Sequence, residues 1–342
     1  MDADPTTNSK NVAIGLNAVL AVVEQERPKV LCLREPDNVF SLPYGPFDPI
    51  HHRTFEIGLR DWVERQTNVT LGYVEQLYTF GDLGREAPTA ALAGGNQDDR
   101  IISVGYLALA PKPADVNASH AIWRDWYDFF PWEDWRNGEP GSVSKMILPA
   151  LFQWANIASD SIVRDSRLRR IRSSFGNNNT GWEEERSLDR YELMYEAGLI
   201  EEAFRETRPD AAGAKADPQI FAHTGKPMAS DHRRILATAM GRLRGKLKYR
   251  PIIFRLMPAR FTLLSLQKTA ESVVGFNFHK QNFRRSVETG SFVDRTDETI
   301  QQASGRPAAL FKVSEKVQKD RAAAGLVLPR LRAQPAFFEK TQ

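Results

Sequence analysis

Basic and amide side chains gather on one face of a short segment near the C-terminus. Phe283 and Val287 are four residues apart, so on a helix they share a face that packs inward. Arg, Gln and Asn make paired hydrogen bonds to base edges in the DNA major groove. At about 100° per residue, the opposite face of this helix presents Lys280, Gln281, Asn282, Arg284 and Arg285. The spacing predicts a DNA-reading helix over residues 278–287.

The residues around this segment predict the elements that would position it. Residues 261–274 have the apolar spacing of an amphipathic helix, with Thr262 as its N-cap and Gly275 at its C-terminal end. Residues 291–293 and 305–312 then predict a β-hairpin wing with Arg306 at a basic tip, suited to phosphates or the minor groove. Together they predict a winged helix. The alternative is a short helical hairpin with a solvated basic face.

The charge balance supports DNA binding. Between Arg242 and Arg285 eleven residues are Lys or Arg and one, Glu271, is acidic, a local balance of +10. The whole chain carries +3, which leaves 3 − 10 = −7 for the remainder. A concentration of positive charge is expected where a surface displaces counterions from phosphates.

Length and composition set the broad class of protein. The 342 residues indicate two domains with an insertion, and 42% hydrophobic residues suffice for real cores. Cys32 is the only cysteine, so an internal disulfide and a four-thiolate zinc site are excluded. The first ten residues lack the basic stretch of a signal peptide, and the apolar run 12–23 is too short to span a bilayer. We therefore expect a cytoplasmic protein without membrane association.

The N-terminal half predicts a mixed sheet. Strand patterns cover residues 12–23, 29–35, 72–80 and 100–109, and a helix pattern covers 54–66. This order favours an α+β fold built as an α/β/α sandwich.

The order and several short motifs resemble a Nudix domain, and the whole chain resembles the Nudix-related transcriptional regulators of NAD metabolism, the NrtR family. The N-terminal motifs are Leu42-Pro43-x-Gly45, residues 75–85 (Glu-Gln-Leu-Tyr-Thr-Phe-Gly-Asp-x-Gly-Arg) and residues 100–109. The C-terminal motifs are Asp231-His232-x-x-Ile235, residues 243–247, residues 282–285 and residues 305–308. The resemblance covers residues 10–135 and 228–315.

The resemblance implies an α+β architecture: a Nudix-like α/β/α sandwich with a helical insertion, followed by a winged helix-turn-helix. We expect a Nudix-like domain at 10–136, a mostly helical insertion at 137–226 and a closing helix at 227–248, which would be capped and would link the two domains. A DNA-binding winged helix at 249–316 and a tail at 317–342 complete the prediction.

The catalytic motif of Nudix hydrolases is degraded here. Those enzymes need a helix whose glutamates hold Mg²⁺ or Mn²⁺. With Val63 and Val69 on the apolar positions, the glutamate positions hold Trp62, Arg65 and Gln66. Shifting the frame by one residue recovers only Glu64 and Asp61. The sequence predicts no catalytic residues, no metal site and no cofactor.

A Nudix cleft can still bind a nucleotide that it does not cleave, and the resemblance implies ADP-ribose or a related NAD metabolite as effector. Arg34, Arg85 and Arg100 are the candidate phosphate partners. Tyr78 and Phe80 are the candidates for stacking on adenine. The alternative for these two aromatics is that at least one of them belongs to the core.

We therefore expect a homodimeric regulator, most simply a repressor of NAD-metabolism genes, whose partners are double-stranded operator DNA and a small nucleotide effector. The alternative class is a nucleoside-diphosphate-linked hydrolase with an unusual metal site, for which the adjacent His51 and His52 would be candidates. RNA binding is a third class, but the basic segment lacks the aromatic surface that single-stranded RNA stacks on.

Overall fold

The computed structural model describes residues 12–35, 39–82, 100–116, 120–176, 181–205, 218–301, 307–315 and 317. Seven strands form one mixed sheet in the order β3–β2–β1–β6–β5, with β4 also pairing with β1 and β7 with β2. β1 and β6 run parallel, with Val12 opposite Arg100 and Ala21 opposite Leu109. The strands are β1 (Val12–Glu24), β2 (Arg27–Arg34), β3 (Phe40–Ser41), β4 (Tyr44–Pro46), β5 (Tyr73–Phe80), β6 (Arg100–Leu109) and β7 (Ala121–Asp125).

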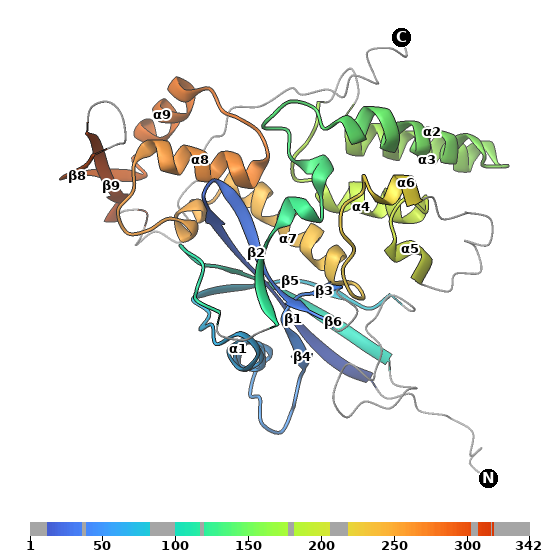
Figure 1. Cartoon of the computed structure of the whole chain (residues 1–342), viewed down its shortest axis with the longest axis horizontal. Helices are drawn as coiled ribbons and strands as arrows, with labels where there is room; N and C mark the ends of the chain where they lie inside the picture. Colours follow the sequence, from blue (N-terminus) through green and yellow to red (C-terminus); the bar gives the residue numbers. More distant parts are fainter. Residues whose placement is uncertain are drawn as a thin grey trace, which may run out of the picture.

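Side chains of the central strand alternate between two hydrophobic cores, as the period of two in a strand requires. Leu16 and Leu20 belong to the core that includes Leu59 and Val63 of α1 (Phe55–Thr67). Val19 and Ala21 belong to the core on the other face, which is covered by α7 (His232–Leu247). The sheet is thus the middle layer of a sandwich, as Figure 1 shows.

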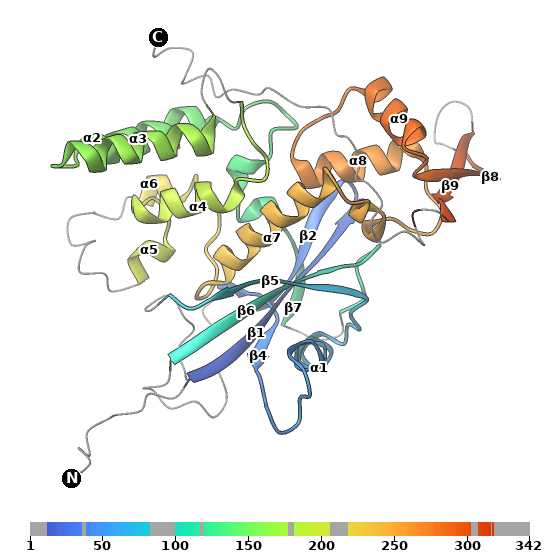
Figure 2. The ribbon, with the colours of Figure 1, turned by 180° about the vertical axis from the view of Figure 1, so that it is seen from behind.

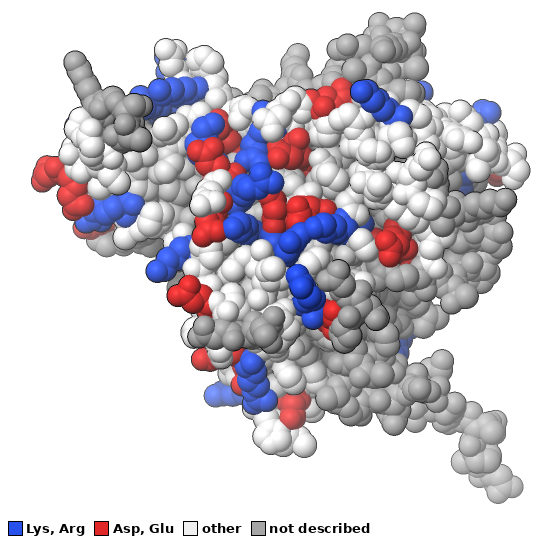
Figure 3. Space-filling view, in the orientation of Figure 1, with Lys and Arg blue, Asp and Glu red and all other residues white. Residues whose placement is uncertain are grey.

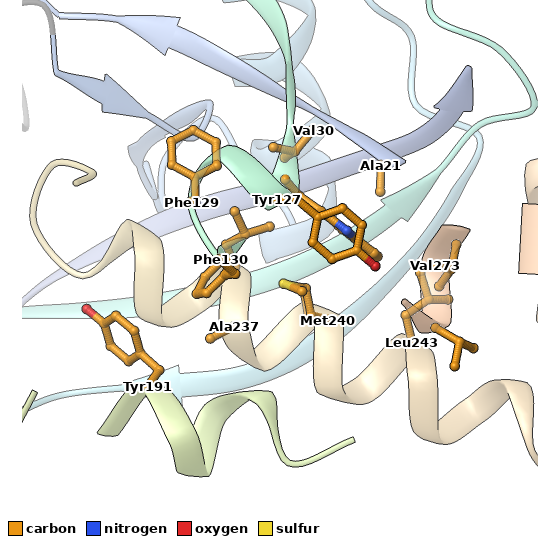
Figure 4. Close-up of a cluster of buried hydrophobic side chains, with 14 of the residues drawn as sticks. Ala21, Val30, Tyr127, Phe129, Phe130, Tyr191, Ala237, Met240, Leu243 and Val273 are labelled. Carbon is orange, nitrogen blue, oxygen red and sulfur yellow. The ribbon is translucent and has the colours of Figure 1, made fainter. Parts of the chain in front are cut away.

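The α7 core joins several parts of the chain. Figure 4 shows Ala21 and Val30 of the sheet, Tyr127, Phe129 and Phe130, and α7 side chains packed in one cluster. The aromatic segment 126–135 that supplies three of these residues contains two 3-10 turns, η2 (Trp126–Asp128) and η3 (Pro131–Glu133). It follows β7 directly and packs between the sheet and the helices.

Helices between residues 143 and 221 form a second region, seen in yellow-green and green in Figures 1 and 2. A break separates α2 from α3, and Asp160 caps the new helix that follows it. The elements are η4 (Val143–Ile147), α2 (Leu148–Asn156), α3 (Ser161–Phe175), α4 (Ser187–Glu196), α5 (Glu202–Arg205) and α6 (Pro218–Phe221).

The C-terminal elements have the predicted order. The 3-10 turn η6 (Ile252–Leu256) leads into α8 (Leu263–Val274), α9 (Lys280–Thr289) and the hairpin of β8 (Val293–Ile300) and β9 (Ala308–Val313). In Figure 1, α8 lies between the sheet and α9. The predicted α+β class is confirmed. One detail was wrong: the closing helix was expected to be capped, but α7 has no side-chain capping hydrogen bond, and the Asp231 side chain before it lies 3.6 Å from Arg234.

Within the described residues, none of the helices combines the length and the apolar character needed to cross a membrane.

Candidate nucleic-acid interface and effector site

Helix α9 presents a polar face outward. Phe283 is 1% exposed and Val287 is fully buried. The Phe283 ring also stacks on Phe278, with ring centroids 5.8 Å apart and planes 3° from parallel. The side chains predicted to read DNA all lie on the exposed face: Lys280, Gln281, Asn282, Arg284 and Arg285.

Helix α8 and the following turn set the direction of α9. Thr262 caps α8, accepting a hydrogen bond from the Ser265 N–H at 3.0 Å, and Gly275 ends it in the left-handed conformation with φ 85°. The buried Glu271 carboxylate accepts the Phe278 N–H at 2.8 Å. Phe278 lies just before α9, so this bond fixes the helix-turn-helix angle.

The predicted wing is present as the antiparallel hairpin of β8 and β9. Arg306, predicted at its basic tip, lies outside the described residues, as do all of residues 302–306. The described strand β8 carries three acids, Asp294, Asp297 and Glu298, beside one cation, Arg295. Glu298 lies 3.6 Å from Arg260. Acids therefore outnumber cations in β8, so this strand has no net positive charge for a phosphate contact.

Part of the basic charge counted in the sequence faces the protein rather than solvent. Arg244 is fully buried and binds Glu133, while Lys246 pairs with Glu75 of β5. Lys248 lies 2.6 Å from Glu185. The balance of +10 therefore overstates the charge available to DNA, because these cations at the end of α7 are neutralised by acids from elsewhere in the chain.

The face of the molecule in Figure 3 shows basic and acidic side chains interleaved over its centre. Pairs along β2, β7 and the segment after β7 have this character, such as Arg124 with Asp128 at 2.5 Å and Arg136 with Asp134 at 2.8 Å. Such a face has little net field, unlike the exposed face of α9.

The degraded Nudix positions on α1 hold a neighbouring strand in place. The Trp62 indole N–H donates to the Pro46 carbonyl at 2.8 Å, and a Cβ at Gly45 would collide with the Trp62 ring. Gln66 bonds to both backbone groups of Tyr44. Where a hydrolase places metal-binding carboxylates, these side chains fasten β4 to α1.

Several other charged groups on and near α1 form pairs. Arg65 lies 2.9 Å from Asp61, and Asp61 also lies 3.3 Å from Nε2 of His52. His51 instead contacts Asp48 at 2.5 Å, and this hydrogen bond lowers the pKa of Asp48 to about 2. The two histidines thus contact different carboxylates. Across the part of the chain that the structure describes, no three His, Cys, Asp or Glu side chains form a group that could hold a metal ion.

Three of the segments predicted to contact an effector point toward the same end of the sheet, which we call the effector end. β1 and β6 run parallel, while β2 and β5 run antiparallel to them. Arg34 at the end of β2 and Arg100 at the start of β6 therefore lie at the same end of the sheet as Gly81. Both arginines are exposed, and Arg100 donates to the Gly81 carbonyl at 2.6 Å. Arg85 lies outside the described residues.

Of the two candidates for stacking on adenine, only Tyr78 is exposed to solvent. Tyr78 is 59% exposed, whereas Phe80 is 2% exposed in the core below α7. The prediction that Phe80 stacks on a ligand was wrong. A register shift between Gln76 and Tyr78 interrupts the alternation of β5, and after it the Tyr78 ring lies beside the Phe80 ring, with centroids 5.3 Å apart.

Arg234 was missed by the sequence analysis. It projects from the first turn of α7 over the Phe80 ring, 5.3 Å from its centroid, and lies 2.5 Å from Asp82 and 2.6 Å from Glu192. It thereby joins the effector end to α7 and α4. The sequence carried only a weak signal, the adjacent Arg233 and Arg234 after Asp231-His232.

The fold and the α9 face together define a DNA-binding winged helix attached to a mixed α/β sandwich. Residues 253–313 match the family described as NrtR DNA-binding winged helix domain. The C-terminal part of the chain is therefore a winged helix of the NrtR type.

Relatives of known structure extend the likeness to the whole fold. The chain is similar to NrtR of Shewanella oneidensis complexed with a 27mer DNA, with a TM-score of 0.54 and 18% identity over 93% of this chain and 99% of the other. A second crystal structure of Shewanella oneidensis NrtR gives a TM-score of 0.52 at 18% identity, over 92% of this chain and 99% of the other. At these identities the likeness shows the fold.

One curated relative matches in sequence. It is the "ADPR responsive transcriptional repressor NtrR" of Acinetobacter baylyi, 38% identical over 85 residues. The match covers 25% of this chain and spans 34% of the relative's length.

Proposed function

We propose that this protein is a transcriptional repressor that binds operator DNA through α9 and responds to ADP-ribose or a related nucleotide. The observation that carries the proposal is the exposed face of α9, set by Phe283 and Val287, within a segment that matches the NrtR winged helix domain. The Acinetobacter baylyi relative, described as an ADPR-responsive repressor, supports the same response in this chain. NAD-metabolism genes are the targets that the resemblance implies.

We place the effector at the effector end of the sheet. Arg34 and Arg100 supply guanidinium groups suited to a diphosphate, and the exposed Tyr78 supplies an aromatic ring. Arg234 is added to this site, because its pair with Asp82 ties the end of β5 to α7.

We propose that the bound nucleotide is not hydrolysed. Trp62 and Gln66 form structural contacts with β4, and Arg65 would repel a cation at the position of a metal-binding glutamate. The alternative hydrolase would need a metal site of other residues, and nothing in the described region favours one.

We also propose a twofold dimer. A single winged helix buries a modest DNA surface, and reading two related half-sites is the usual way to gain specificity. Light scattering on the protein and footprinting on its operator test this. A monomer that protects one asymmetric site would contradict it.

The operator is obtained by sequencing the DNA retained by the purified protein. Calorimetry then measures ADP-ribose binding with and without that operator, beside an assay for AMP release with Mg²⁺ or Mn²⁺. We expect ADP-ribose to lower DNA affinity, and operator to lower ADP-ribose affinity by the same factor. Metal-dependent AMP release at enzyme-like rates would overturn the non-catalytic part. Identical ligand binding with and without operator would leave the two domains uncoupled.

A further inference from the structure

The C-terminal end of α8 is hydrogen-bonded from outside the winged helix. The last carbonyls of a helix have no partner within it. Here the Ser272 carbonyl accepts from the Tyr127 hydroxyl at 2.7 Å, and the Val273 carbonyl accepts from Arg244 Nε at 2.9 Å. The Gly275 carbonyl accepts from the Trp135 N–H at 2.7 Å. We call Tyr127, Trp135 and Arg244 the α8 clamp.

The contacts continue into the turn that leads to α9. The Trp135 ring stacks on Phe276, with centroids 5.6 Å apart, and Asn277 donates to the Arg136 carbonyl at 2.6 Å. Phe278 comes next, held by Glu271 and stacked on Phe283 of α9. The position of α9 is thus tied, residue by residue, to the segment that holds α8.

A buried ion cluster fixes the clamp. Glu133, Arg190 and Arg244 are each 0% exposed. The Glu133 carboxylate accepts from Arg190 Nε at 2.6 Å and from Arg244 Nη1 at 2.5 Å. Burial alone would raise the Glu133 pKa, but the two guanidinium groups hold it below its ordinary value. The carboxylate therefore stays charged, and moving the clamp would strand a buried charge.

The same segment reaches the effector end of the sheet. Arg34 donates its backbone N–H to the His120 carbonyl at 2.7 Å, directly before β7 begins. β7 pairs with β2 along its length and then continues into the residues that carry Tyr127 and Trp135. Residues 120–136 are thus one continuous connection between a candidate effector residue and the turn before α9.

We propose that Tyr127, Trp135 and Arg244 are positioning residues for DNA recognition: they hold α8, and through it α9, in the orientation that reads operator DNA. Residues 120–136 are then a second route, beside α7, by which an effector alters DNA affinity. The proposal rests on the DNA binding proposed above.

The first test removes one hydroxyl. Tyr127→Phe keeps the ring and deletes two hydrogen bonds of the hydroxyl: the one it donates to the Ser272 carbonyl and the one it accepts from Arg244 Nη2 at 3.3 Å. The matched control is Tyr195→Phe, at a tyrosine of α4 that is 2% exposed. We expect Tyr127→Phe to lower operator affinity about 3- to 10-fold, with less change on random DNA. This is the range of one lost hydrogen bond, because the 3.3 Å bond from Arg244 is the weaker of the two that the hydroxyl makes. Amide hydrogen exchange over residues 275–283 should become faster in this variant, and the control should resemble the wild type in both measurements.

The second test uses two glycines with positive φ. A Cβ on Gly275 (φ 85°) would lie 2.3 Å from the Glu133 carbonyl oxygen, whereas one on Gly138 (φ 93°) meets nothing within 4 Å. Both Gly→Ala changes place a side chain on a residue with positive φ, but only Gly275→Ala forces α8 away from the clamp. We expect Gly275→Ala to lose operator affinity at least as severely as Tyr127→Phe, and Gly138→Ala to retain it.

The outcomes separate the two proposals. Unchanged operator affinity together with unchanged exchange in Tyr127→Phe would overturn the positioning role. A wild-type protein that binds no DNA would overturn the proposed function, and the exchange comparison in the DNA-free protein would still decide whether Tyr127 holds α8 and α9.

Discussion

The side-chain amide of Gln66 forms two hydrogen bonds with the backbone of Tyr44. The Tyr44 N–H donates to Gln66 Oε1 at 3.1 Å, and Gln66 Nε2 donates to the Tyr44 carbonyl at 2.8 Å. An amide has both a donor and an acceptor, so it completes this pair as a carboxylate cannot. Gln66, which aligns with a metal-binding glutamate of Nudix hydrolases, therefore has the side chain that holding the Tyr44 backbone requires.

We predict that restoring a glutamate at this position destabilises the protein and does not create a hydrolase. In Gln66→Glu a carboxylate oxygen would face the Tyr44 carbonyl, at a cost of about 1–3 kcal/mol. Urea unfolding measures the loss, and Gln76→Glu, at an exposed position of β5, is the control. Full stability with new metal-dependent AMP release would contradict the structural role.

The exposed face of α9 should carry sequence specificity. We expect Arg285→Ala and Gln281→Ala each to weaken operator binding by about 1–3 kcal/mol, with a smaller effect on random DNA. Gel-shift titrations measure both affinities. Arg172→Ala, which removes an exposed arginine of α3, is the control. Equal losses of affinity for operator and random DNA would show that the two residues contact phosphates rather than bases. No loss of affinity would contradict the assignment of α9 as the DNA-reading helix.

Substitutions of Tyr78 and Phe80 should have different effects, one on ligand binding and the other on stability. We expect Phe80→Ala to cost about 3–5 kcal/mol of unfolding free energy, because it opens a cavity in the core. Tyr78→Ala should unfold like the wild type and bind ADP-ribose more weakly, which calorimetry and urea unfolding together would show. If Tyr78→Ala binds ADP-ribose normally, the stacking role belongs to another residue.

The buried Glu133 should make stability depend on pH in the acidic range. Its folded pKa lies below the ordinary 4.5, so its contribution is complete above that pH and is lost as pH falls through the lowered pKa. We expect Glu133→Gln to cost about 3–5 kcal/mol at neutral pH, with the difference from wild type narrowing below pH 4.5.

Urea unfolding at several pH values measures this. Glu196→Gln, which breaks a partly exposed pair with Arg170, is the control and should cost at most about 1 kcal/mol. A constant difference between Glu133→Gln and wild type across the range would show that Glu133 ionisation does not act on stability.

Local signals made the winged helix predictable from sequence. Thr262 and Gly275 mark both ends of α8, and the spacing of Phe283 and Val287 fixes which face of α9 is buried. These signals lie within a few residues of the structure they specify. The sandwich was predictable for a similar reason, since alternation in β1 and the apolar side of α1 are read within one element.

Long-range pairing was not predictable in this way. Arg244 appears in sequence as one more cation of a basic segment, yet it is buried against Glu133, 111 residues earlier in the chain. The prediction that Phe80 contacts a ligand was wrong because one bulge in β5 changes which side chains face the core. Neither a distant carboxylate nor a register shift leaves a pattern in neighbouring residues.

The Glu133 cluster also sets an order for events during synthesis on the ribosome. Its partners Arg190 and Arg244 follow 57 and 111 residues later. At bacterial and eukaryotic elongation rates, Arg244 is synthesised roughly 6–20 s after Glu133. Until then the neighbouring aromatics, among them Trp126, Phe130 and Trp132, lack the helix that covers them. A nascent chain halted before α7 should therefore expose an apolar surface that chaperones bind.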